Sequence, residues 1–134
     1  MSDPIADLAT LLRTMEPALN EGVYVFAIAP DPGPAPQIEA LATFREKEGL
    51  TIVAREEDAL RCGLPVLFRA AWITLTVHSD LQAVGLTAAF AAALAERGIS
   101  CNVVAAAFHD HIFVPVDRAA DAMDRLRRMQ AYGK

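Results

Sequence analysis

The chain has 134 residues, which allows one compact domain or two small modules that share a core. Its 17 acidic residues outnumber the 12 basic ones, and the net charge of −5 argues against nucleic acid as a partner, because phosphate binding requires clustered Lys and Arg. The hydrophobic fraction is 54%, but no apolar run can span a bilayer and the first residues lack a secretion signal, so we expect a cytoplasmic protein without membrane contact.

The first half of the chain predicts a helix, three strands and a second, shorter helix. The first helix opens at Asp3-Pro4 and ends before Pro17. The continuous apolar run VYVFAIA is typical of a central strand, and the proline-rich segment PDPGPAPQ of a stiff surface loop. The segments ALATFR and LTIVA then predict two strands joined by a turn, and REEDALRCG predicts the short charged helix.

The second half predicts the order strand, helix, strand, strand, helix. RAAWITLTV alternates apolar and polar residues, as a half-buried strand does. Helical spacing follows, with Leu86, Phe90 and Leu94 four residues apart and Gly98 as a suitable helix end. ISCNVVAAA and HIFVPV predict two further strands. Asp117 can cap a final helix, whose predicted buried stripe is Ala119, Ala122, Met123, Leu126 and Met129.

This order is that of a ferredoxin-type βαββαβ unit without its final strand. Two such units nearly fit in the chain, yet little sequence follows the last predicted helix. We therefore predict an α+β protein with antiparallel sheets. It consists of two ferredoxin-like halves, residues 1–66 and 67–134, which share or exchange a strand.

The segment AVGLTAAFAAALAERGISCNVVAAAFHDHIFVPVDRAADAMDRL resembles an ACT domain, the small-molecule-sensing module of amino-acid metabolism. Val84-Gly85-Leu86 stands where that family shows a Pro-Gly-Leu-type step into the helix, and Gly98-Ile99 stands at its helix-to-strand junction. LTVHSDLQAVGLTAAF, HDHIFVP and ATFREKEGLTIV are similar to short, stand-alone bacterial ACT-like proteins of undefined function. The resemblance implies two ACT-like halves and a ligand-binding or regulatory role, with amino acids bound at the loop after the first strand.

Two polar motifs of the second half are expected to meet. In a ferredoxin-like unit, the turn between the second and third strands lies at the same end of the sheet as the end of the first strand. His78-Ser79-Asp80 and His109-Asp110-His111 therefore converge on one rim. Free backbone amides at the start of the following helix add an anion-binding end. The candidate ligand-binding residues are His78, Ser79, Asp80, Val84, Gly85, Leu86, His109, Asp110, His111 and, in the first half, Arg45.

Two other interpretations remain open. An H-x-H pair on an extended segment projects both imidazoles to one face, so His109, His111 and His78 could hold a metal ion in a metal-dependent enzyme. Alternatively, the motif is only a hydrogen-bonded turn in a structural interaction module. No further His, Cys or Glu backs the trio, so we prefer a non-catalytic amino-acid sensor without metal or cofactor. We expect a homodimer, because unmatched sheet edges favour association, and an enzyme is a further candidate partner.

Overall fold

The computed structural model describes residues 8–30, 36–76 and 85–133. The chain divides into two compact units. The middle unit is Glu21–Ala70, and the terminal unit combines Met1–Asn20 with Ala71–Lys134. These names refer to positions along the chain only.

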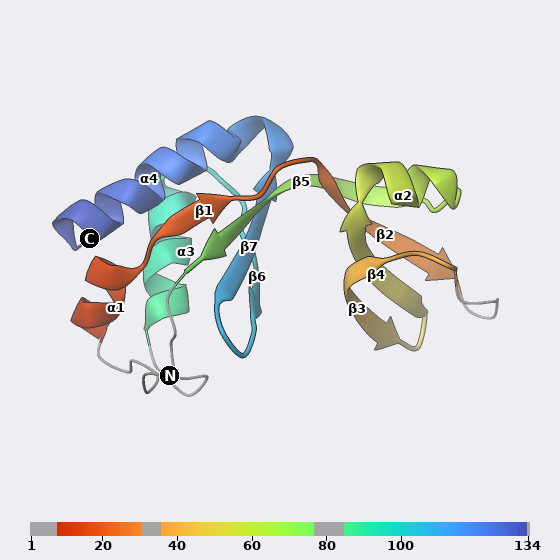
Figure 1. Cartoon of the computed structure of the whole chain (residues 1–134), viewed down its shortest axis with the longest axis horizontal. Helices are drawn as coiled ribbons and strands as arrows, with labels where there is room; N and C mark the ends of the chain where they lie inside the picture. The colour runs from red at the N-terminus through yellow and green to blue at the C-terminus, as the bar shows by residue number, and fades with distance from the viewer. Residues whose placement is uncertain (1–7, 31–35, 77–84, 134) are drawn as a thin grey trace. The chain divides into compact units, whose positions relative to one another are not determined.

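The middle unit is an antiparallel sheet with one helix (Figure 1). Its strand order is β3-β4-β2-β5, so β2 is central, as its continuous apolar sequence predicted. Along β2, Val25 and Ala27 point to one face, where they bury Ala59 of the helix. The elements are β2 (Tyr24–Pro30), β3 (Ala40–Glu46), β4 (Gly49–Arg55), α2 (Glu56–Arg61) and the first part of β5 (Val66–Leu75).

The terminal unit obtains its fourth strand from the beginning of the chain. Its strand order is β1-β5-β7-β6, and β1 (Pro17–Leu19) lies antiparallel to the second part of β5, with Pro17 opposite Leu75. The other two strands are β6 (Asn102–Ala105) and β7 (Asp110–Pro115). β1 thus takes the place of the strand that a ferredoxin-type unit has after its last helix. The predicted boundary between halves 1–66 and 67–134 stays a prediction.

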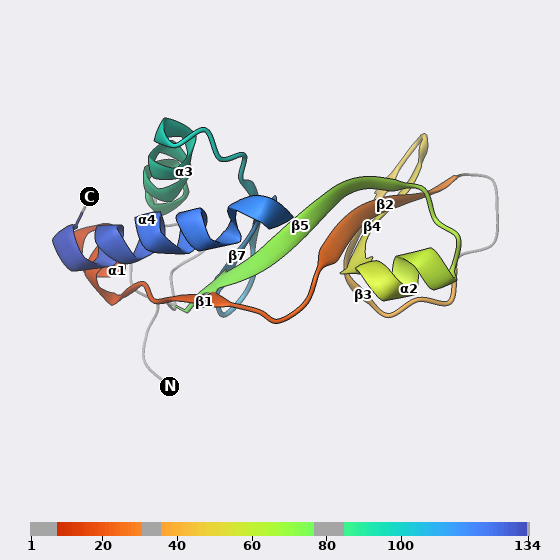
Figure 2. The same cartoon turned by 90° about the horizontal axis from the view of Figure 1, so that it is seen from above.

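Three helices cover one face of the sheet in the terminal unit, and Figure 2 shows α4 beside α1 and α3. They are α1 (Leu8–Thr14), α3 (Leu86–Glu96) and α4 (Ala119–Tyr132). The predicted spacing is confirmed, because the side chains that recur every three or four residues are buried in one core. That core includes Leu11, Met15, Ile73, Leu75, Leu86, Phe90, Leu94, Ile112, Val114, Ala122, Met123, Leu126 and Met129.

The start of α4 differs from the prediction. A 3₁₀ turn, η1 (Val116–Arg118), precedes the helix, and Arg118 is the N-cap residue without a side-chain cap. Asp117 lies inside this turn, so the predicted Asp117 cap is wrong. Instead, Asp121 accepts hydrogen bonds from Arg118 and Arg97, which ties the first turn of α4 to the end of α3.

Candidate functional site

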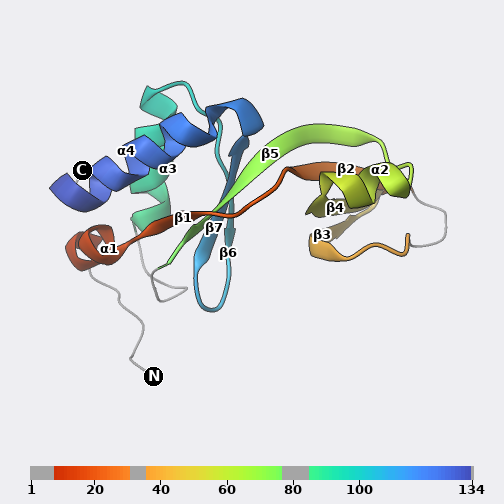
Figure 3. The same cartoon turned by 45° about the horizontal axis from the view of Figure 1, so that its top comes forward.

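Three described segments of the terminal unit lie where the sequence predicts the rim. Figure 3 shows the turn of the β6–β7 hairpin, the end of β5 and the first turn of α3 at the same end of the unit. Ala105 pairs with Asp110, and the Ala106 amide donates to the His109 carbonyl over 3.1 Å, so the turn itself lies at Ala107 and Phe108. His109 therefore precedes β7, whereas Asp110 and His111 are its first two residues and face opposite sides of the sheet.

Asp110 is buried on the helix-covered face of the sheet. Its exposed fraction is 4%, and the next residues on the same side of β7, Ile112 and Val114, belong to the core. In the described ranges, no side chain forms a hydrogen bond or ion pair with the Asp110 carboxylate. Burial raises the pKa of this carboxyl group, and the neighbouring His111 and His109 oppose that rise. A buried carboxyl group that lacks a partner among the described residues is costly to the fold and can bind a ligand.

His111 faces the other side of the sheet. Its Nδ1 accepts a hydrogen bond from Nε1 of Trp72 over 3.1 Å and lies 3.3 Å from Oγ1 of Thr74. Asn20 donates to the same Thr74 hydroxyl over 3.0 Å, so the polar group joins β5, β7 and the residue that follows β1. Burial lowers the pKa of His111, and the charge of His109 lowers it further. His111 is thus engaged in a hydrogen-bonded group on the face opposite the Asp110 side chain.

His109 lies between the turn and the strand. Its Nδ1 is buried and has no hydrogen-bond partner within the described part of the chain. Buried polar atoms are normally hydrogen-bonded, so an unpartnered one at a strand end is a place where a bound molecule can supply the missing bond. His109 and Asp110 are adjacent in the chain, so an unpartnered ring nitrogen and a largely buried carboxyl group occur side by side in the sequence at the start of β7.

The first turn of α3 supplies the third part of the rim. Gly85 is its N-cap residue, has a φ of 103°, and provides no side-chain cap. The Ala89 amide donates to the Gly85 carbonyl, whereas the amides of Leu86 and its next neighbours precede the first intrahelical bond. Leu8 of α1 packs against Gly85: a Cβ atom on Gly85 would lie 3.2 Å from Cδ2 of Leu8.

The other predicted site residues lie elsewhere. His78, Ser79, Asp80 and Val84 fall outside the described residues. Arg45 is an exposed residue of β3 in the middle unit. Among residues that the structure describes, no group of three or more His, Cys, Asp or Glu side chains is arranged to hold a metal ion. No helix in the described ranges is long and apolar enough to cross a membrane.

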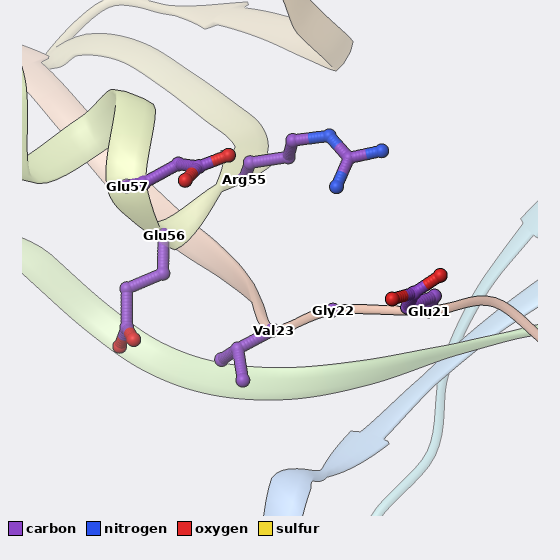
Figure 4. Close-up of a pocket in the computed structure, with 6 residues that line it drawn as sticks. All are labelled: Glu21, Gly22, Val23, Arg55, Glu56 and Glu57. Atoms are coloured by element: carbon purple, nitrogen blue, oxygen red, sulfur yellow. The ribbon is translucent and has the colours of Figure 1, made fainter.

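A pocket of about 490 Å³ lies in the middle unit, and sequence reasoning did not find it. Its walls come from the segment before β2 and from the junction of β4 with α2 (Figure 4). The lining residues are Glu21, Gly22, Val23, Arg55, Glu56 and Glu57. In the sequence, Arg55-Glu56-Glu57 predicts only the start of a charged helix, and the pocket depends on strand pairing that brings the two segments together.

Comparison with known proteins identifies the class. One ACT-domain family model matches residues 3–71, and a second matches residues 68–128. The chain belongs to the ACT-domain family and contains two ACT-like, ferredoxin-type halves. ACT domains generally bind small-molecule ligands, which supports a regulatory, ligand-binding role.

Solved structures extend this likeness. A Vibrio cholerae protein, VC0802, is 47% identical with a TM-score of 0.81, and the match covers 92% of this chain and 95% of that one. It is described as a protein of unknown function and possible transport protein. Agrobacterium tumefaciens Atu0741 is 17% identical, with a TM-score of 0.69 and coverage of 87% and 89%.

The regulatory subunit of aspartate kinase from Thermus thermophilus is 10% identical, with a TM-score of 0.58 and coverage of 87% of this chain and 97% of that chain. At this identity the likeness concerns the fold alone. The search of curated proteins finds no match.

Proposed function

We propose that this protein is a non-catalytic sensor that binds an amino acid or a similar small carboxylate at the rim of its terminal unit. The observation that carries the proposal is the buried carboxyl group of Asp110, which none of the described side chains neutralises. A ligand ammonium group would supply the missing partner, and the strength of a charge-assisted hydrogen bond is greatest in such a desolvated place.

The rest of the rim supports the same chemistry. The amides at the start of α3 can donate hydrogen bonds to a ligand carboxylate. Nδ1 of His109 is a further unsatisfied group. In the proposal, His78, Ser79, Asp80 and Val84 complete the rim. His111 contributes through its hydrogen bonds to Trp72 and Thr74, which fix the start of β7.

The regulatory role is proposed from family membership. We further propose that the protein acts in the cytoplasm as a homodimer and transmits ligand binding to an enzyme partner. Arg45 lies in the middle unit, and its role at a ligand carboxylate remains part of the proposal.

Thermal unfolding in the presence of single amino acids and small carboxylates tests the proposal. A ligand at about one hundred times its dissociation constant stabilises the folded state by about 2.7 kcal/mol. We expect one ligand class to raise Tm of the natural protein, and Asp110→Asn to remove most of that rise relative to its own ligand-free Tm. Asp117→Asn is the matched control, because this exposed carboxylate lies in η1. If no compound raises Tm, or if Asp110→Asn retains the full rise, the proposed sensor role is wrong.

A further inference from the structure

We propose that the middle unit carries a second binding site, in the pocket between the start of β2 and the β4–α2 junction. Its ligand is a small molecule with one carboxylate and two cationic amines, as in a basic amino acid. This second site shares no residue with the rim around Asp110. The observations that support it do not depend on the role proposed for the rim.

The pocket is built by the end of a strand ladder. Tyr24 and Arg55 form the last residue pair between β2 and β4. Just beyond this pair, the Glu56 amide donates to the Val23 carbonyl over 2.9 Å. The two chain segments then separate, one leading back to Glu21 and the other into α2. Backbone hydrogen bonds therefore fix the point at which the two segments separate.

Arg55 is held in place without being neutralised. Its Cζ lies 5.5 Å from the centre of the Tyr24 ring, and the Tyr24 hydroxyl donates to the Glu21 carbonyl over 2.9 Å. A Cβ atom on Gly22 would lie 3.3 Å from Nη1 of Arg55, so a side chain there would press on the guanidinium. Within the described ranges, Arg55 forms no ion pair. A guanidinium stacked on an aromatic ring, with its donors free, suits bidentate binding of a carboxylate.

The three carboxylates of the pocket are not equivalent. Glu56 accepts two hydrogen bonds from Arg69 of β5, and this contact lowers the pKa of Glu56. Figure 4 shows the Glu56 side chain pointing away from Arg55, toward the β5 ribbon, whereas Glu57 extends on the side of Arg55. In the described part of the chain, Glu21 and Glu57 have no ion-pair partner. The charged groups of the pocket without an ion-pair partner among the described residues are therefore the guanidinium of Arg55 and the carboxylates of Glu21 and Glu57.

The complement of these charges defines the ligand. A carboxylate meets Arg55, and two amines meet Glu21 and Glu57. A volume of about 490 Å³ lies within the range of small-molecule sites, roughly 300 to 1,000 Å³. All three groups are exposed, so salt screens them and the affinity should fall as ionic strength rises.

Amide NMR titration of the whole protein with L-lysine tests this site. We expect lysine to shift the amides of Gly22, Val23 and Glu57, with binding at least about tenfold tighter than that of norleucine or 1,5-diaminopentane. Norleucine lacks the second amine, and 1,5-diaminopentane lacks the carboxylate. Arg55→Gln and Glu57→Gln should each weaken lysine binding about tenfold or more. Arg61→Gln on the same helix should not, because Arg61 pairs with Asp58 outside the pocket.

Three results would overturn the second site. They are the absence of any shift with lysine at low salt, equal binding of norleucine, and lysine binding that Arg55→Gln leaves unchanged. Asp110→Asn separates the two proposals, because it should leave lysine binding at this pocket intact. If lysine instead shifts Gly85 and His109 and is lost in Asp110→Asn, the pocket is excluded while the rim is supported.

Discussion

Nε1 of Trp72 donates a hydrogen bond to Nδ1 of His111 over 3.1 Å, which joins β5 to β7 on the face opposite the three helices of the terminal unit. Because Nδ1 accepts, the neutral imidazole carries its proton on Nε2. Protonation at Nδ1 would replace this acceptor with a second donor facing the indole N–H. The contact therefore exists only while His111 is neutral.

This contact predicts a pH dependence of stability. The pKa of His111 is lowered in the folded state by burial and then by the charge of His109, so the unfolded chain binds this proton more readily. The contribution of His111 is fully present above about pH 6.5, the usual histidine pKa, and is lost as pH falls from there through the folded-state pKa. Urea unfolding followed by Trp72 fluorescence at pH 7.5 and 5.0 measures it. His111→Gln keeps a hydrogen-bond acceptor but does not titrate. Its free energy of unfolding should therefore fall less between pH 7.5 and 5.0 than that of the natural protein. An equal loss would contradict the assignment.

Asp110→Asn should stabilise the protein near neutral pH. Burial raises the pKa of Asp110, so the ionised carboxylate carries a cost in the folded state. That cost is fully present above the raised pKa and disappears as pH falls below about 4, the usual aspartate pKa. We expect the free energy of unfolding to rise by about 1 kcal/mol at pH 7, with the difference from the natural protein shrinking toward pH 4. Denaturant unfolding at both pH values checks this. A destabilised Asp110→Asn variant would show that the carboxylate makes favourable contacts in the unliganded protein.

Gly85→Ala should destabilise more than Gly98→Ala. Both glycines have positive φ, 103° and 70°, which costs alanine about 1 kcal/mol or more. Only at Gly85 does the new Cβ also meet a neighbour, Cδ2 of Leu8 at 3.2 Å, while Gly98 has open space. Denaturant unfolding of the two variants, and of Leu8→Ala combined with Gly85→Ala, separates the terms. Leu8→Ala should recover part of the Gly85→Ala loss. If Leu8→Ala recovers none of the lost free energy of unfolding, the contact with Leu8 adds nothing to the cost of backbone strain in Gly85→Ala.

The segment that supplies β1 should be essential to the terminal unit. Met15, just before β1, is completely buried in the core with Leu11. Met15→Ala should lower the free energy of unfolding by about 2–5 kcal/mol, the usual cost of a large-to-small change in a core. Leu19→Ala is the control, because the Leu19 side chain is 49% exposed and its loss should cost under about 1 kcal/mol. Similar losses in chemical unfolding for both variants would count against a shared core.

The helices and most strands were predictable because their signal is local. Leu86, Phe90 and Leu94 recur at helical spacing, and all three are buried. The apolar run of β2 predicted its central place. β1 was not predictable, because a strand of three residues, PAL, is too short to show an alternating pattern. Pro17 indicates only the end of a helix. Its partner, Leu75, is distant in the sequence, so only tertiary pairing reveals the strand.

The sequence by itself determined an α+β chain of two ACT-like halves, because periodicity and strand order restrict the possible folds. The tertiary structure decided which side each motif residue faces. Asp110 lies on the buried face and His111 on the other, since a shift of one residue along a strand reverses the side chain. The tertiary structure also decided that the Arg55 guanidinium lies beside Gly22. The register of β2 and β4 brings these two residues together, and no sequence motif links them.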